Sequence, residues 1–190
     1  MNAYRLLDRL GLRELLRRAY RVDVVGAERV PASGAAILVA NHESIWDPFV
    51  LGVVTEREIH YMAKAELFRT RPLAAALRAL NAFPVERGGG DRAAISEAAR
   101  LLESGALLGI FPQGTSKRER QIGWHRGAAR LALATGAPVV PVRLTGTRPL
   151  PWPTRIRIVV GEPIAVEPER PTISTARALT ERLERAVTAA

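Results

Sequence analysis

The sequence predicts one α/β domain, in which helices flank a mixed, largely parallel sheet. Short apolar runs alternate with segments of helical periodicity, which is the pattern of layered α/β folds. The length of 190 residues fits one domain with a sizeable core, and a hydrophobic content of 47% argues against disorder.

The N-terminal segment, residues 1–21, reads as an amphipathic basic helix in which leucines alternate with arginines. Two roles are open to it: anchoring on a membrane surface, or packing on the core of the domain. The remaining residues, 22–190, form the predicted α/β domain.

Along that domain, apolar runs and turn signals indicate the elements in order. Strands are predicted at 22–26, 35–40, 58–63, 82–85, 106–111, 138–142 and 155–160. One helix is predicted to start near Ser44 or Asp47, and further helices are predicted at 73–80, 95–102, 126–135 and 173–187. In such sheets, ligands gather beyond the carboxyl ends of the strands, so these strand ends are where we look for a site.

Composition narrows the function classes. The net charge of +9 favours anionic partners, namely nucleic acid, anionic lipid or phosphorylated substrates, although a GC-rich genome explains the same arginine bias. No recognisable nucleic-acid-binding motif accompanies the charge, and aromatic residues make up only 5%. The absence of cysteine excludes disulfides and thiolate chemistry.

The apolar runs are also too short to cross a bilayer. The longest, 35–40 and 49–54, fall far below the roughly 20 residues of a transmembrane helix, and the N-terminus lacks the features of a secretory signal. We therefore expect a protein that is neither transmembrane nor exported.

The stretch NHESIWDP, residues 41–48, places a histidine and an aspartate just after a buried strand. If Asp47 turns back toward His42, it can fix the imidazole tautomer and stabilise the imidazolium, which is the arrangement of a general base. The alternative is that Asn41 and Asp47 are turn and cap residues and that His42 is incidental.

Two further strand ends suit an anionic group such as a phosphate. Arg87 closes the run FPVER beside a glycine-rich loop, and the run IFPQGTS places a Gly-Thr turn before Lys117. Taken singly, each of these two segments is equally typical of a solvent-exposed loop without a bound ligand.

Together, these motifs resemble the glycerolipid acyltransferases, typified by bacterial 1-acyl-sn-glycerol-3-phosphate acyltransferase. NHESIWD resembles the first motif of that family, LNAFPVER the second, GIFPQGTS the third and APVVPV the fourth. YMAKAEL and RIRIVVGEPI resemble its neighbouring segments, so the similarity runs in order from about residue 22 to 165.

The resemblance implies O-acyl transfer from an acyl thioester, on coenzyme A or acyl carrier protein, to the hydroxyl of a lysophosphatidate-like acceptor. His42 would be the general base and Asp47 its orienting partner, with no acyl-enzyme, cofactor or metal; His60 and His125 are expected to be structural. The substrate-binding residues implied are Asn41, Ser44, Lys64, Arg87, Gln113, Gly114, Thr115, Ser116 and Lys117. It also implies a cytoplasmic protein, peripheral on the inner face of an anionic membrane, that binds no nucleic acid.

Three positions depart from the family pattern. Gln113 stands where glutamate is usual, Ser116 where arginine is frequent and Asn81 where glycine is usual. The same chemistry on another acceptor (glycerol 3-phosphate, a lyso-aminolipid or a specialised metabolite) is therefore the main alternative, and drift without functional effect explains the departures equally well. A catalytically silent lipid-binding relative is disfavoured because both His42 and Asp47 are present.

Overall fold

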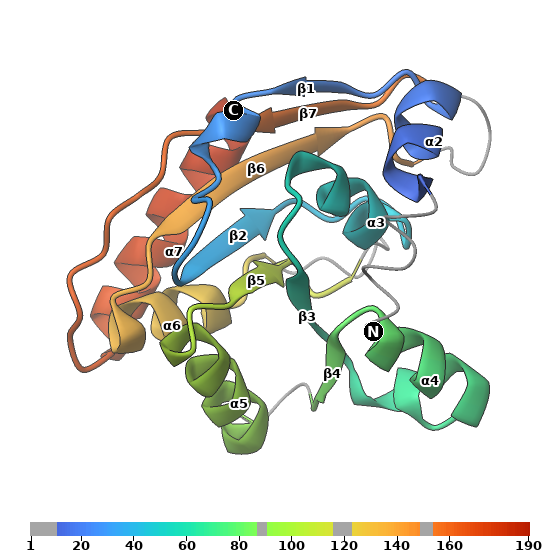
Figure 1. Ribbon diagram of the computed structural model, residues 1–190. Coiled ribbons are helices and arrows are strands. Elements are labelled where there is room, and N and C mark those ends of the chain that lie inside the picture. The colour runs from blue at the N-terminus through green and yellow to red at the C-terminus, as the bar shows by residue number, and fades with distance from the viewer. Residues whose placement is uncertain (1–10, 87–90, 116–122, 149–153) are drawn as a thin grey trace.

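The computed structural model describes residues 11–86, 91–115, 123–148 and 154–190, and within them the strands form one seven-stranded sheet (Figure 1). The order is β1-β7-β6-β2-β5-β3-β4. All neighbouring strands are parallel except β6 and β7, which confirms the predicted mixed, largely parallel sheet. The strands are β1 (Asp23–Val25), β2 (Ala36–Ala40), β3 (Ile59–Lys64), β4 (Ala82–Val85), β5 (Leu107–Ile110), β6 (Val139–Thr145) and β7 (Arg157–Val160).

The carboxyl ends of β6, β2, β5, β3 and β4 meet along one side of the sheet, which we call the carboxyl edge. The helices are α2 (Leu12–Ala19), α3 (Asp47–Leu51), α4 (Arg71–Ala79), α5 (Arg92–Glu103), α6 (Gly127–Thr135) and α7 (Ile173–Ala189). In Figure 1, α2, α3 and α4 lie on the side of the molecule toward which the β2 and β6 arrows point, and α7 lies on the opposite side.

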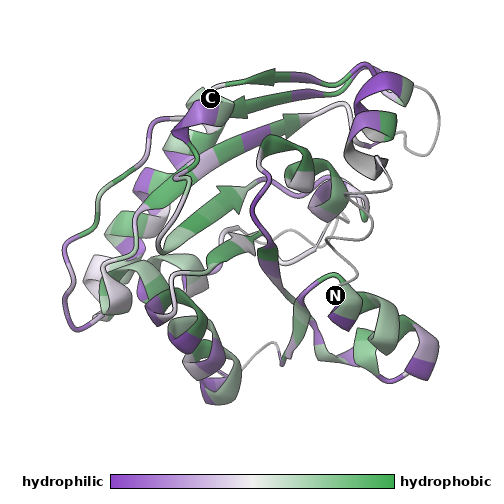
Figure 2. Cartoon of the chain, in the orientation of Figure 1, coloured by the Kyte–Doolittle hydropathy of each residue, from purple (hydrophilic) through white to green (hydrophobic). Residues whose placement is uncertain are grey.

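Strand β2 shows why the sheet lies in the middle of the molecule. Every residue of its run AILVA is fully buried, as expected for a central strand covered on both faces. Because side chains alternate along a strand, Ile37 and Val39 join a core with α5, α6 and α7, while Leu38 joins a second core with α3. Figure 2 shows these central strands as the most hydrophobic part of the chain.

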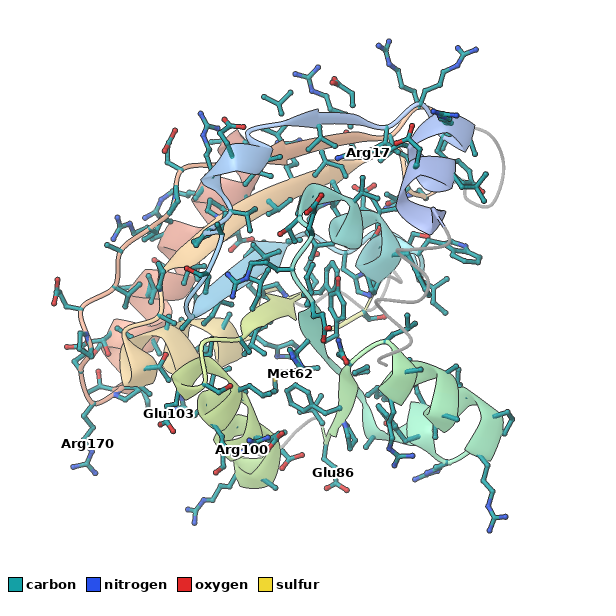
Figure 3. The ribbon with its side chains drawn as sticks, viewed as in Figure 1. Arg17, Met62, Glu86, Arg100, Glu103 and Arg170 are labelled. Carbon is teal, nitrogen blue, oxygen red and sulfur yellow. The ribbon has the colours of Figure 1, made fainter. Side chains whose placement is uncertain are left out.

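Charged side chains occupy the outside of this arrangement. In Figure 3, Arg100 and Glu103 project outward from α5 and Arg170 from the segment before α7, whereas Met62 lies between β3 and α5. Among the described residues, Asp47 is the one charged residue that is buried.

Of the predicted N-terminal helix, the structure describes the part from Leu12 to Ala19, as α2; the predicted residues 1–10 lie outside the described ranges. Arg17 of α2 donates a hydrogen bond from Nη2 to the Val53 carbonyl at 3.1 Å, while Leu15 is 63% exposed. Thus α2 contacts the domain on one side and presents an apolar side chain to solvent on another. No helix in the described parts of the chain is long and apolar enough to span a bilayer.

Candidate active site

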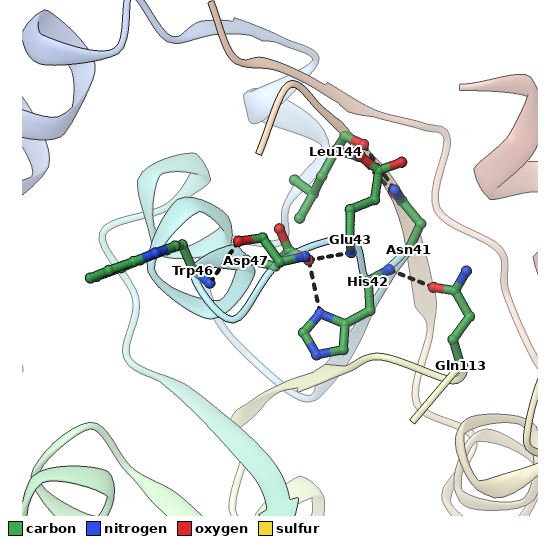
Figure 4. Close-up of polar contacts among 8 residues, drawn as sticks. Asn41, His42, Glu43, Trp46, Asp47, Gln113 and Leu144 are labelled. Carbon is green, nitrogen blue, oxygen red and sulfur yellow. Dashed lines mark hydrogen bonds and ion pairs between the residues drawn. The ribbon is translucent and has the colours of Figure 1, made fainter. Parts of the chain in front are cut away.

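The loop after β2 brings His42 and Asp47 together at the carboxyl edge (Figure 4). Asp47 opens α3, and its Oδ2 lies 2.8 Å from Nδ1 of His42. The same oxygen accepts the backbone N–H groups of Glu43 at 2.6 Å and Ser44 at 2.8 Å. The carboxyl group is fully buried, so three hydrogen bonds to one oxygen hold it in a single orientation.

This pairing bears on which ring nitrogen of His42 can accept a proton. A carboxylate beside Nδ1 favours the tautomer in which Nδ1 carries the proton and Nε2 accepts one. The His42 side chain is 16% exposed, so the ring is partly shielded from water but still reachable. A shielded imidazole with a fixed tautomer is what a general base requires.

Two aromatic side chains, Phe111 and Tyr61, form an aromatic wall beside His42 that limits the tilt of its ring. Phe111, at the end of β5, stacks on His42 with ring centroids 4.6 Å apart and planes 29° from parallel. Tyr61 of β3 lies behind Phe111 at 6.4 Å, and its hydroxyl donates to the Pro48 carbonyl in α3 at 2.8 Å. The wall therefore links three elements around the histidine.

Two side-chain amides tie the histidine loop to the neighbouring strands. Asn41 pairs with both main-chain groups of Leu144 in β6: its Nδ2 donates to the carbonyl at 2.8 Å and its Oδ1 accepts from the N–H at 2.7 Å. Gln113, beyond β5, accepts the His42 backbone N–H on Oε1 at 2.5 Å. Both residues, predicted to bind substrate, are placed to position His42.

Two other predicted site residues take part in local turns. Ser44 is buried, and its Oγ accepts the Trp46 N–H at 3.3 Å. Gly114 adopts a left-handed φ of 69° and donates its N–H to the Phe111 carbonyl at 2.9 Å, closing the turn that leads to Thr115.

Further along the carboxyl edge, Lys64 ends β3 and forms an ion pair with Glu66 at 2.9 Å; this contact lowers the pKa of the Glu66 carboxyl. The Asp91 carboxylate accepts the Glu86 and Ala94 N–H groups, which lowers its own pKa. Asp91 thus joins the end of β4 to the start of α5. Arg87, Ser116 and Lys117, also predicted to bind substrate, lie outside the described residues.

The departure at Asn81 has a conformational explanation. Asn81 follows α4 with a φ of 58°, in the left-handed region that most side chains avoid. Asparagine tolerates this region better than most other residues with a side chain, so it can take the place of glycine without altering the turn.

The other two histidines lie on β3 and just before α6, where the backbone N–H of His125 donates to the Pro112 carbonyl at 2.8 Å. Burial lowers the pKa of His60, which lies on β3 near Glu58, Glu97 and Arg100, and His125 is exposed. Among the described residues, no group of three or more His, Asp or Glu side chains is arranged to hold a metal ion.

The sequence profile of the family described as Acyltransferase matches residues 21–145, which is more than half of the chain and contains the His42–Asp47 pair. The chain belongs to the Acyltransferase family.

Individual relatives agree with this assignment. The 1-acyl-sn-glycerol-3-phosphate acyltransferase of Bacillus subtilis is 33% identical over 147 residues, covering 75% of this chain and 73% of that protein. The chloroplastic BAT2 enzyme of Brassica napus, with the same activity in its name, is 27% identical over 158 residues, but the chain spans only 45% of it.

A solved structure supports the fold as well. The crystal structure of the 1-acyl-sn-glycerophosphate acyltransferase PlsC from Thermotoga maritima matches with a TM-score of 0.71 and 25% identity, covering 94% of this chain and 78% of that one. The protein is therefore an O-acyltransferase of the 1-acyl-sn-glycerol-3-phosphate acyltransferase type.

Sequence reasoning missed the aromatic wall. Phe111 lies inside the block GIFPQGTS and Tyr61 inside YMAKAEL, but the motifs alone assign a role to neither residue. The available signal was position: Phe111 is the last residue of the predicted strand 106–111. The Asn41–Leu144 pairing left no such signal, because it joins residues 103 positions apart.

Proposed function

We propose that this protein transfers a fatty acyl group from an acyl thioester to the hydroxyl of a lysophosphatidate-like acceptor. The observation that carries the proposal is the hydrogen bond between Nδ1 of His42 and buried Asp47, because it leaves Nε2 as the proton acceptor of the ring. The named activity of the Bacillus subtilis relative supports the choice of acceptor.

In this mechanism, Nε2 of His42 removes the proton of the acceptor hydroxyl while the hydroxyl oxygen attacks the thioester carbonyl carbon. The carbon–sulfur bond then breaks, and the thiol leaves with the proton that the imidazolium returns. Asp47 stabilises the imidazolium between these steps without accepting the proton. The acyl group passes directly to the acceptor, which agrees with a chain that has no cysteine.

The acceptor's phosphate is proposed to bind farther along the carboxyl edge. Arg87 would be its main partner, together with Gly114, Thr115, Ser116 and Lys117, and Lys64 would add positive charge. The helix-capping carboxylate Asp91 accepts the N–H of Glu86, the residue directly before Arg87 in the chain. The donor is proposed to be acyl-CoA or acyl-ACP.

A different acceptor is the second candidate. Glycerol 3-phosphate, a lyso-aminolipid or a specialised metabolite would use the same base. The observation that favours this candidate is Ser116 in the third block, where arginine is frequent in the family. In either case we propose that the enzyme works as a peripheral protein on an anionic membrane surface, with the basic segment 1–21 contributing to its attachment.

The proposal is tested by measuring thiol release from acyl-CoA and acyl-ACP against a panel of lysolipids and small alcohols. Because the chain contains no cysteine, a thiol reagent reports only the released carrier. We expect turnover with lysophosphatidate, and we expect the rate of thiol release to be lower by about 10²-fold or more in His42→Ala. His60→Gln, which changes a histidine of β3 that lies near Glu97 and Arg100 of α5, is the matched control.

Turnover only with another acceptor on the panel would select the second candidate. Turnover that survives His42→Ala undiminished would reject the general-base mechanism.

A further inference from the structure

Helix α4 is much more exposed than α6, the other helix of the same length. It buries only one of its nine residues, Ala74, whereas α6, which also has nine, buries five. The exposed residues of α4 are Arg71, Pro72, Leu73, Ala75, Ala76 and Arg78. How these side chains are arranged around the helix therefore decides what α4 can bind.

The arginines and the exposed leucine of α4 lie on different flanks of the helix. Arg71, Ala75 and Arg78 follow the spacing i, i+4 and i+7, so they share one face, which we call the arginine face. Leu73, which is 43% exposed, is displaced from Arg71 by about 160° around the helix axis. An apolar surface that contacts Leu73 therefore leaves the arginine face available to a different partner.

The charge of the arginine face is not neutralised by its neighbours. Within the described residues, neither Arg71 nor Arg78 takes part in an ion pair. Glu66, the acidic residue nearest to Arg71 along the chain, is already paired with Lys64 at 2.9 Å. By contrast, α5 and α7 each contain an arginine–glutamate pair of their own. The arginine face is therefore a local excess of positive charge that suits an acidic partner.

The geometry of the two arginines narrows the kind of acidic partner. The guanidinium of Arg78 lies 5.6 Å from the centroid of the Phe68 ring, a cation–π contact that orders the side chain before a partner binds. A rise of about 1.5 Å per residue places Arg71 about 10 Å from Arg78 along the helix, with the small Ala75 between them. Two cations with this spacing match two carboxylates that lie two turns apart on an acidic helix.

The arginine face also belongs to the part of the fold that borders the candidate site. Helix α4 follows β3 through the short 3-10 helix Ala65–Phe68, so it is connected to the carboxyl edge. Phe68 and Leu77 pack against the same apolar core as Phe111, the ring that stacks on His42. A partner bound to α4 is therefore attached beside the core that supports the histidine.

We propose that the arginine face is the docking surface for an acyl carrier protein, which delivers the fatty acyl thioester. Acyl carrier proteins are small, acidic and helical, and they hold the acyl group on a phosphopantetheine arm. An acidic helix against Arg71 and Arg78 places the base of that arm beside the carboxyl edge, from which the thioester extends toward His42. The inference rests on the proposed function and selects the carrier-bound thioester as the preferred donor.

Charge reversal tests the surface in the intact enzyme. The double variant Arg71→Glu with Arg78→Glu is assayed by thiol release from palmitoyl-ACP and from palmitoyl-CoA, with a soluble short-chain lysophosphatidate and no vesicles. We expect KM for palmitoyl-ACP to rise by about tenfold or more while kcat stays near the wild-type value, because reversed charges repel an acidic protein. Both kinetic constants for palmitoyl-CoA should be unchanged.

The same change of charge elsewhere is the matched control. Arg182→Glu with Arg185→Glu alters exposed arginines of α7, on the other side of the molecule (Figure 1), and should keep the wild-type KM for both donors. Arg71→Glu alone leaves the contact of Arg78 with Phe68 intact and should raise KM for palmitoyl-ACP by a smaller factor, whereas Arg71→Lys should not raise it. Equal rises for the two donors, or equal rises in the α4 and α7 double variants, would overturn the proposal.

A binding measurement separates this inference from the proposed function. Fluorescence anisotropy of dye-labelled acyl carrier protein reports its affinity without acyl transfer, and the α4 double variant should bind it about tenfold more weakly than the wild type. Added salt should weaken binding to the wild type, because it screens the charges. A wild type that binds the carrier through α4 but transfers no acyl group would reject the function and leave the docking surface standing. A double variant that loses binding to phosphatidylglycerol vesicles, with unchanged affinity for the carrier, would assign the face to lipid and contradict the inference.

Discussion

His42 is held from three directions: Asp47 bonds its ring, Phe111 stacks on its face, and Gln113 accepts its backbone N–H. Asp47 fixes the tautomer and the rotation of the ring, Phe111 limits its tilt, and Gln113 holds the main chain in place. Under the proposed mechanism, a base placed in this way needs no rearrangement before it accepts a proton.

The contact of Gln113 makes a prediction about its variants. Gln113→Glu keeps an oxygen that accepts the His42 N–H, so turnover should stay close to the wild type on every acceptor. Gln113→Ala removes the acceptor and should lower kcat by about three- to tenfold on all acceptors alike, as expected for one lost hydrogen bond. A Gln113→Glu enzyme that changes its preference among acceptors would instead assign this residue to acceptor recognition.

Among the elements, β5 connects core packing to the site. Gly109 lies beneath Tyr61, and a Cβ on Gly109 would come within 2.5 Å of the Tyr61 ring. Tyr61 in turn supports Phe111, whose ring covers His42. The glycine therefore sets the position of the aromatic wall through a close approach, without a positive φ.

Gly109→Ala should consequently affect both stability and rate. We expect the free energy of unfolding to fall by about 1–3 kcal/mol, because the added methyl overpacks the site, and kcat to fall with it. Denaturant unfolding and thiol release measure the two effects. Gly127→Ala, where no atom lies near the added methyl, is the control; equal behaviour of the two variants would show that Tyr61 does not support the site.

Strand β3 contributes a pH dependence through His60. Burial lowers the pKa of His60 in the folded protein, and Arg100 lowers it further, while Glu58 and Glu97 act in the opposite direction. Below about pH 6.5, His60 therefore binds a proton more readily in the unfolded chain than in the folded protein. The free energy of unfolding consequently decreases as the pH is lowered. Denaturant unfolding at about pH 7.5 and 5.5 should show this loss, and His60→Gln should reduce it; an unchanged pH dependence would contradict the assignment.

At the scale of the whole molecule, much of the fold could be predicted from sequence, because strand and helix periodicities are local signals. The apolar run 35–40 predicted the central strand β2, and Pro48 marked the start of α3. The order of the strands across the sheet and the Asn41–Leu144 pairing could not be predicted, since they join residues far apart in the chain. Spacing indicated that His42 and Asp47 could meet, but only coordinates give their separation.

The central claim is that His42 and Asp47 act as one unit in catalysis. It is tested most directly by comparing kcat for His42→Ala, Asp47→Asn and the double variant, with folding of each checked by circular dichroism. Groups that act together lose activity non-additively. We predict that the double variant is no slower than His42→Ala alone; losses that multiply, or an Asp47→Asn enzyme as fast as the wild type, would contradict the account.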